Sequence, residues 1–261
     1  MFFYPQKQLV RTPQDIGLAY EDVTFSSLDG TRLHGWFLPA QGPAKATVVF
    51  VHGNAENIST HVAAVYWLPA AGYNVFAFDY RGYGRSEGKE SLDGVHLDAR
   101  AALDYVRGRA DVDPARLVLF GQSLGGAVAL YTAATSQVPL RAVVVESSFS
   151  DYRKIFREKL SDLIITWPLQ WPLSFTVSDQ YSPLAVIADL KAPLLVIHGD
   201  ADPIVPVSHA HALYSAAKGD KTLWIIEQGG HTAAFGPMRE VYRPKLVEYL
   251  ESRLAGGGNP H

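Results

Sequence analysis

A serine flanked by glycines is the first feature of the sequence that could do chemistry. Gly121-Gln122-Ser123-Leu124-Gly125 has the spacing G-x-S-x-G. Residues 116–120 form an apolar run typical of a buried strand, and the small residues of 124–134 are typical of a helix. A serine at such a strand-to-helix turn is held in a strained conformation that exposes its hydroxyl. In this context the motif favours a nucleophile at Ser123 over a glycine-rich packing turn.

A serine hydroxyl attacks a carbonyl only when a neighbouring base takes its proton, and that base is usually a histidine. In strand-to-helix serine enzymes the chain order is nucleophile, acid, histidine. Four histidines follow the last candidate acid loop: His209, His211, His231 and His261. The first two begin a predicted helix, and His261 is the last residue. His231 follows the final predicted strand in a glycine loop, so it is the predicted base.

The acid that orients this histidine should follow the preceding strand. That loop contains Asp200 and Asp202, the second of which precedes Pro203. Asp200 is well placed to accept backbone amides within the turn, and spacing alone favours Asp202 only slightly. Glu146, at the end of an earlier predicted strand, is a third candidate. Its alternative role is that of a hydrogen-bonded structural carboxylate beside the nucleophile.

Two backbone amides are needed to stabilise the negative charge that develops on the attacked carbonyl oxygen. One is expected from Leu124, the residue after the nucleophile. The other is expected in the loop after strand 47–52, where Gly53 allows the chain to turn the Asn54 amide inward. His52 opens this loop, and we expect it to hydrogen-bond neighbouring loops rather than to act as a base.

The elements that position these residues alternate between strand and helix over most of the chain. Helices are predicted at 59–71, 92–109, 124–134, 208–217 and 237–254. Eight strands are predicted at 20–27, 31–38, 47–52, 74–79, 116–120, 141–146, 193–198 and 222–227. This order predicts an α/β fold: one mostly parallel sheet with helices on both faces, preceded by an antiparallel hairpin. Residues 1–254 are expected to form a single domain, and 255–261 a flexible tail.

Residues 150–182 interrupt this alternation and are rich in aromatic side chains. They form either an excursion with its own small core or a short cap over the strand ends, where open α/β sheets bind ligands. In the second case Phe149, Trp167 and Trp171 are candidates for the substrate pocket. Tyr83, in another loop at the strand ends, is a further candidate.

Composition narrows the possible partners. The 261 residues carry a net charge of -3 without a basic block, which argues against nucleic acid as a partner. The chain has no cysteine, so disulfides and thiolate metal sites are excluded. No metal or organic cofactor is predicted. No apolar run reaches the ~18 residues of a membrane-spanning helix.

Five motifs together resemble the α/β-hydrolase superfamily: H-G-N-A-E-N at 52–57, D-Y-R-G-Y-G-R-S at 79–86, G-Q-S-L-G at 121–125, H-G-D-A-D-P-I-V-P at 198–206 and G-G-H at 229–231. The first two are similar to a branch of small-lid hydrolases that includes membrane-anchored depalmitoylase-like proteins. The resemblance implies the α/β-hydrolase fold and identifies Asp202 as the acid. Residues 2–5 resemble the segment that follows such an anchor, so an anchor upstream of this chain is compatible with the pattern.

The expected activity is hydrolysis of a small-molecule carboxylic ester or thioester through an acyl-enzyme, without a cofactor. The aromatic residues of 150–182 favour an apolar acyl group. A peptidase of the prolyl-oligopeptidase type shares the order of the triad, but it usually carries a large accessory domain for which 261 residues leave no space. A non-catalytic binding protein with the same fold is the other alternative.

Overall fold

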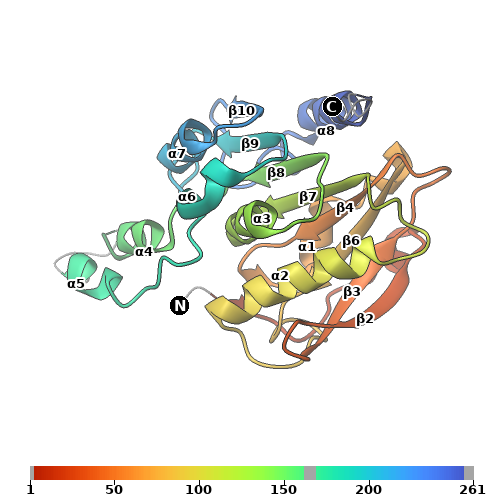
Figure 1. Cartoon of the computed structure of the whole chain (residues 1–261), viewed down its shortest axis with the longest axis horizontal. Helices are drawn as coiled ribbons and strands as arrows, with labels where there is room; N and C mark the ends of the chain where they lie inside the picture. The colour runs from red at the N-terminus through yellow and green to blue at the C-terminus, as the bar shows by residue number, and fades with distance from the viewer. Residues whose placement is uncertain (1–2, 162–168, 256–261) are drawn as a thin grey trace.

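The fold is built on one large sheet that crosses the molecule (Figure 1). The computed structural model describes residues 3–161 and 169–255. The eight strands lie in the order β10-β9-β8-β7-β4-β6-β3-β2. They are β2 Glu21–Ser26, β3 Arg32–Leu38, β4 Ala46–Val51, β6 Tyr73–Asp79, β7 Leu117–Gln122, β8 Ala142–Glu146, β9 Leu194–Gly199 and β10 Lys221–Ile226. The hairpin β2–β3 and the pair β3–β6 are antiparallel, whereas the other neighbours are parallel. The predicted sheet is confirmed.

The central strands are buried on both faces, which explains why they read as continuous apolar runs. In β4, Val49 and Val51 belong to one hydrophobic cluster, while Val48 and Phe50 belong to the cluster on the opposite face. Successive side chains of a strand point to opposite faces, so one strand supplies both cores.

Helices cover both faces of the sheet. They are α1 Ile58–His61, α2 Leu92–Arg107, α3 Leu124–Thr135, α4 Tyr152–Ser161, α5 Gln170–Ser174, α6 Pro183–Val186, α7 Ser208–Ala216 and α8 Arg239–Ala255. Helices α2, α3 and α7 bury side chains in the first cluster, and α8 packs into the second. None of the helices within these described parts of the chain is long and apolar enough to cross a bilayer.

The prediction of one helix over 59–71 is wrong. The segment contains the short helix α1 followed by separate 3-10 turns at Val62–Ala64 and Pro69–Ala71. Proline has no amide hydrogen to donate within a helix and starts new turns readily, and Gly72 then ends the second turn with φ 90°. A second small sheet was not predicted: β1 Tyr4–Pro5 pairs in parallel with β5 Ala55–Glu56.

Between β8 and β9, helices α4 and α5 project beyond the end of the sheet (Figure 1). Helix α4 is amphipathic, with Ile155, Phe156 and Leu160 buried. The predicted pocket residue Trp167 lies outside the described residues, as does the tail 256–261. Ala255, which was assigned to the flexible tail, is the last residue of α8.

Candidate active site

Ser123 occupies the turn between β7 and α3 in a conformation that non-glycine residues seldom adopt, with φ 53° and ψ −120°. Its amide donates to the Glu146 carbonyl oxygen at 2.9 Å. The flanking glycines are required by packing: a Cβ on Gly121 would lie 2.2 Å from the Gly125 carbonyl oxygen, and one on Gly125 would lie 2.0 Å from that of Val51. The sequence pattern and the observed turn therefore agree.

His231 and Asp202 are in direct contact, with His231 Nδ1 2.7 Å from Asp202 Oδ2. The other carboxylate oxygen, Oδ1, accepts the amides of Ile204 and Val205 at 2.8 and 2.9 Å. Burial raises the pKa of Asp202, but the hydrogen bonds from His231 and from the two amides outweigh it, and the pKa is lowered overall. Asp202 is thus held as a carboxylate against the imidazole. Asp200, the other candidate in the loop, is exposed.

The loop that carries His231 is attached to the ends of two neighbouring strands. After β9, the Ala201 amide donates to the Gly229 carbonyl oxygen at 3.0 Å. After β8, Ser147 Oγ accepts the Thr232 amide at 2.9 Å. These contacts bring the histidine loop alongside the serine turn, because β8 and β7 are adjacent in the sheet.

Glu146 is not paired with His231 in this way and is completely buried. Its Oε2 accepts from Gln122 Nε2 at 2.5 Å, and its Oε1 accepts from the Ala234 amide at 2.8 Å. Burial raises the pKa of Glu146 to about 7, opposed by these hydrogen bonds. The carboxyl group therefore joins the residue before Ser123 to the loop after His231.

The peptide that carries the Asn54 amide is oriented by His52. Burial lowers the pKa of His52 well below its usual range, so its ring is neutral. Its Nδ1 lies 2.7 Å from the Gly53 carbonyl oxygen, which can only accept, and therefore Nδ1 carries the proton. In a trans peptide the N–H points away from the preceding carbonyl, so this bond turns the Asn54 amide the other way. Leu124 is the first residue of α3, where amides have no partner within the helix.

A cavity of about 620 Å³ joins these groups, since Ser123, His231, Asn54 and Leu124 all lie on its wall. The apolar part of the wall is formed by Phe149, Ile155, Phe156, Leu160, Ile204 and Val205. Tyr4, Gly53, Ala55, His61, Gln122, Lys159 and Thr232 complete it. The cavity therefore offers an apolar surface beside the polar side chains of Ser123 and His231.

Of the predicted pocket residues, Phe149 lines this cavity and two do not. Tyr83 is fully buried beneath the loop, and its hydroxyl donates to the Asn54 carbonyl oxygen at 2.6 Å. Trp171 is 58% exposed on α5, where the Arg157 guanidinium lies 4.2 Å from its ring centre. Neither residue lies on the described wall of this cavity. Tyr83 was a candidate because of its loop at the strand ends and Trp171 because of the aromatic content of its segment, and neither signal indicates which way a side chain faces.

Phe156 belonged to the predicted aromatic segment 150–182 but was not named as a pocket residue, and Ile155 and Leu160 on α4, His61 and Tyr4 were missed. The spacing of the three apolar residues on α4 is helical, and this periodicity could have identified them. No comparable signal exists for Tyr4, whose strand is only two residues long.

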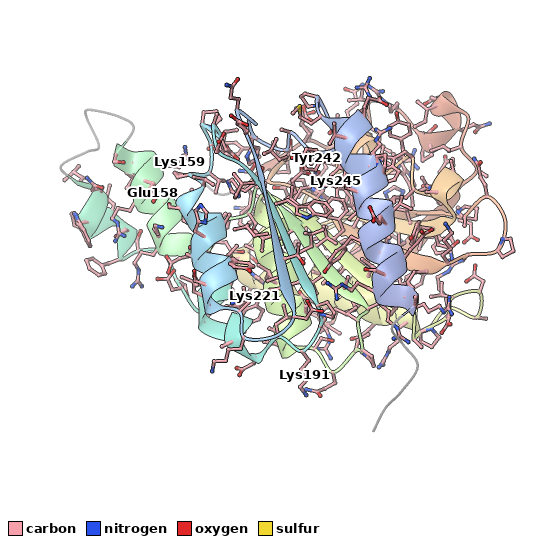
Figure 2. All side chains as sticks on the ribbon, turned by 90° about the horizontal axis from the view of Figure 1, so that it is seen from above. Glu158, Lys159, Lys191, Lys221, Tyr242 and Lys245 are labelled. Atoms are coloured by element: carbon pink, nitrogen blue, oxygen red, sulfur yellow. The ribbon has the colours of Figure 1, made fainter. Side chains whose placement is uncertain are left out.

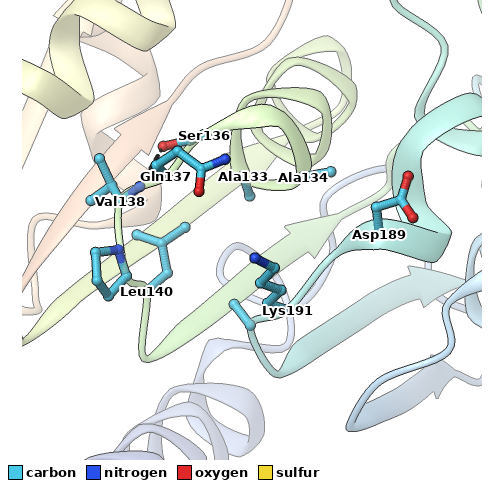
Figure 3. A pocket seen from close by; sticks show the side chains of 10 residues that line it. Ala133, Ala134, Ser136, Gln137, Val138, Leu140, Asp189 and Lys191 are labelled. Carbon is cyan, nitrogen blue, oxygen red and sulfur yellow. Dashed lines mark hydrogen bonds between the residues drawn. The ribbon is translucent and has the colours of Figure 1, made fainter.

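A second cavity, of about 300 Å³, lies at the far end of α3 from Ser123 (Figure 3). Ala133 and Ala134 at the end of that helix line it, together with Asp189 and Lys191. None of the described residues that line it is a histidine, so they offer no imidazole base for serine chemistry. The described part of the chain has no cluster of three or more histidine, cysteine or carboxylate side chains arranged to hold a metal ion.

Relatives in sequence, solved structures and a family model all place the chain among the α/β-hydrolases. YfhR of Escherichia coli strain K12, an uncharacterized protein, is 40% identical over 260 residues, covering 97% of this chain and 87% of that protein. The α/β-hydrolase domain-containing protein WAV2 of Arabidopsis thaliana is 33% identical, covering 92% and 81%. The structure of the Pyrococcus furiosus esterase Pf2001 superposes with a TM-score of 0.81 at 23% identity, covering 97% of this chain and 98% of that one. The family model described as serine aminopeptidase, S33, matches residues 42–179 and 182–237. The chain therefore belongs to this family of α/β-hydrolases.

Proposed function

We propose that this α/β-hydrolase cleaves carboxylic esters or thioesters through a covalent acyl-enzyme on Ser123. The observation that carries the proposal is that the strained Ser123 turn and His231, which is hydrogen-bonded to Asp202, open onto the same largely apolar cavity. Nucleophile, base and orienting acid are then supplied by three loops at the same end of the sheet. The esterase among the structural neighbours is consistent with this chemistry.

In the proposed reaction, His231 Nε2 takes the Ser123 proton as Oγ attacks the acyl carbonyl. The amides of Leu124 and Asn54 stabilise the oxyanion. His231 then protonates the departing alcohol or thiol, and water hydrolyses the acyl-enzyme by the same steps. Asp202 keeps the imidazole in the required tautomer and stabilises its cation.

The cavity favours an apolar acyl group over a substrate with a free amine. None of the described residues on its wall is an aspartate or glutamate, and Lys159 adds a positive charge. An aminopeptidase must hold the ammonium group of its substrate, and an unpaired cation in such a cavity is costly. This argues against aminopeptidase activity, although the family model is described by that name. Residues 150–182, with α4 on the cavity wall, are proposed to form the cap.

The test uses purified protein with p-nitrophenyl esters and acyl thioesters of increasing chain length, an aminoacyl anilide, and a fluorophosphonate probe. We expect ester or thioester turnover, labelling of Ser123, and loss of both in Ser123→Ala. A chain that is not labelled and hydrolyses none of these esters is not the proposed enzyme. Turnover of the anilide alone would favour the peptidase, and labelling without turnover of any substrate would favour a binding protein.

A further inference from the structure

Residues 4–6, near the N-terminus, are hydrogen-bonded to the loop that carries the Asn54 amide. In the small sheet formed by β1 and β5, the Tyr4 amide donates to the Asn54 carbonyl oxygen at 2.9 Å. The Gln6 amide donates to the Glu56 carbonyl oxygen at 3.0 Å. A segment about 50 residues away in sequence therefore runs alongside the predicted oxyanion loop, residues 54–57.

The side chain of Asn57 also holds this N-terminal segment, through hydrogen bonds to its backbone. Its Nδ2 donates to the carbonyl oxygens of Gln6 and Gln8 at 3.0 and 2.8 Å. Its Oδ1 accepts the Ser59 amide at 3.0 Å and so caps α1. The side chain is completely buried, and both ends of its amide are used. Asn57 thus joins the N-terminal segment to the end of the oxyanion loop.

A third connection involves the loop after β6. The Gly84 amide donates to the Gln6 carbonyl oxygen at 2.9 Å, and Lys7 Nζ donates to that of Ser86 at 2.8 Å. Tyr83 gives the Asn54 carbonyl oxygen its second donor. The N-terminal segment consequently lies between two loops of the site.

These contacts constrain the peptides on both sides of Asn54. The preceding carbonyl, that of Gly53, is held by His52, and the Asn54 carbonyl is held by Tyr4 and Tyr83. Glu56 has φ 61°, a conformation that costs on the order of 1 kcal/mol or more and persists only when its surroundings enforce it. The Gln6 amide bonded to its carbonyl is one such constraint.

We infer that residues 4–8 are a positioning element of the active site, which holds the Asn54 amide ready for the oxyanion and adds Tyr4 to the cavity wall. The inference rests on the proposed function. An amide that must reorient during the reaction stabilises the transition state less than one that is already in place. Loosening this segment should therefore lower kcat more than it changes KM.

The main test is Asn57→Asp, assayed at pH 8. The aspartate has the same shape and can still cap α1, but its carboxylate has no hydrogen to donate and repels the carbonyl oxygens of Gln6 and Gln8. We expect kcat for a short ester to fall on the order of 10- to 100-fold, with KM within about twofold. Amide hydrogen exchange should become faster in residues 4–8 and 54–57.

Asn74→Asp is the matched control. Asn74 is also buried and also uses both ends of its amide, accepting from the Ala40 amide and donating to Thr47 Oγ1. It lies at the opposite end of the sheet, at the start of β6. We expect a comparable loss of stability but a kcat close to that of the unaltered protein.

Deletion of residues 2–5 provides a second variant that leaves Asn57 intact. It removes β1 and the Tyr4 amide that is hydrogen-bonded to the Asn54 carbonyl oxygen, so kcat should fall in the same way.

The inference is wrong if amide hydrogen exchange becomes faster in the loop 54–57 while kcat and the fluorophosphonate labelling rate stay unchanged. It is also wrong if exchange in this loop does not respond to either variant. Failure of the unaltered protein to react would instead refute the proposed function.

Discussion

Asp202 and Asp200 are two residues apart in the same loop, yet only one of them contacts the imidazole. Asp202 is 8% exposed and bonded to His231, Ile204 and Val205, whereas Asp200 is exposed. Orientation therefore separates two chemically identical side chains. The distinction matters for the proposed reaction, in which the acid holds the histidine tautomer that accepts a proton from serine.

Replacing each aspartate by asparagine tests this assignment. Asp202→Asn keeps the shape but favours the wrong tautomer of His231, so we expect kcat to fall on the order of 10⁴-fold. Asp200→Asn should leave kcat within about twofold. Both are measured by ester hydrolysis at pH 8. Equal losses in the two variants would contradict the assignment.

Glu146 is the other residue whose role depends on its surroundings. Its pKa of about 7 lies above the ordinary value of 4.5, so the carboxyl group stays protonated to a higher pH in the folded protein than in the unfolded chain. A raised pKa of an acid stabilises the fold below about pH 4.5, and this contribution is lost as the pH rises toward 7. The difference between the two pKa values corresponds to about 3 kcal/mol of unfolding free energy. The unfolding free energy should therefore decrease over this interval.

Glu146→Gln removes the titrating carboxyl group. Its amide oxygen can still accept a hydrogen bond from one of the two donors, Gln122 Nε2 or the Ala234 amide. We expect its unfolding free energy to decrease less between pH 5 and pH 8 than that of the unaltered protein. Urea denaturation at several pH values measures the difference. Glu248→Gln, an exposed change on α8, serves as the control and should follow the unaltered protein. Parallel curves for all three proteins would refute the prediction.

At the scale of elements, the serine turn depends on how closely β4, β7 and α3 approach one another. The Gly125 position lies against the carbonyl oxygens of Val51 and His52 at the end of β4. The Val51 oxygen belongs to the backbone of a central strand, which cannot move aside without disturbing the sheet. The glycine is therefore required by the contact between a helix and a strand.

Gly125→Ala places a methyl carbon 2.0 Å from the Val51 oxygen, so something must shift. We expect a loss of about 1–3 kcal/mol or more in unfolding free energy, together with reduced fluorophosphonate labelling because the turn is displaced. Gly219→Ala is the control: its nearest atom would be the Leu190 oxygen at 3.4 Å, an ordinary contact. A stable, fully labelled Gly125→Ala protein would contradict this account.

At the scale of the whole molecule, helix α4 of the projecting segment lines the cavity that Ser123 and His231 share at the end of the sheet. Helix α4 is held to α7 by Glu158 Oε2, which lies 2.7 Å from His209 Nε2, and Figure 2 shows Glu158 and Lys159 on α4 beside α7. One face of α4 lines the cavity. The width of this cavity, and with it the space for the proposed acyl chain, is thus set between α4 and the loops at the end of the sheet.

Phe156→Ala should enlarge this space. Phe156 is 8% exposed on the cavity wall, so its loss should raise kcat/KM for long relative to short acyl chains by about tenfold. Phe175→Ala, in the same segment but 67% exposed, should leave the ratio unchanged. A panel of ester chain lengths measures both variants. The same shift in both would mean that α4 does not bound the acyl site.

The order of strands and helices and the position of the serine turn followed from local patterns. Buried strands, a small-residue helix and the G-x-S-x-G spacing each depend on neighbours a few residues apart, which is why the eight strands and the turn at Ser123 were predicted. The broken helix at 59–71 and the two-residue strand β1 were not, because their shape depends on contacts with distant residues.

The sequence by itself determined the sheet, its hairpin and which residue types could do serine chemistry, because periodicity and motif spacing express local constraints. The H-G-D-A-D-P-I-V-P motif also indicated Asp202 as the acid, through the family resemblance. Only the tertiary structure decided that Tyr83 supports the loop instead of lining the cavity, and that Tyr4 joins its wall. These outcomes depend on which loops meet at the end of the sheet. Long-range packing sets that arrangement, and no local pattern records it.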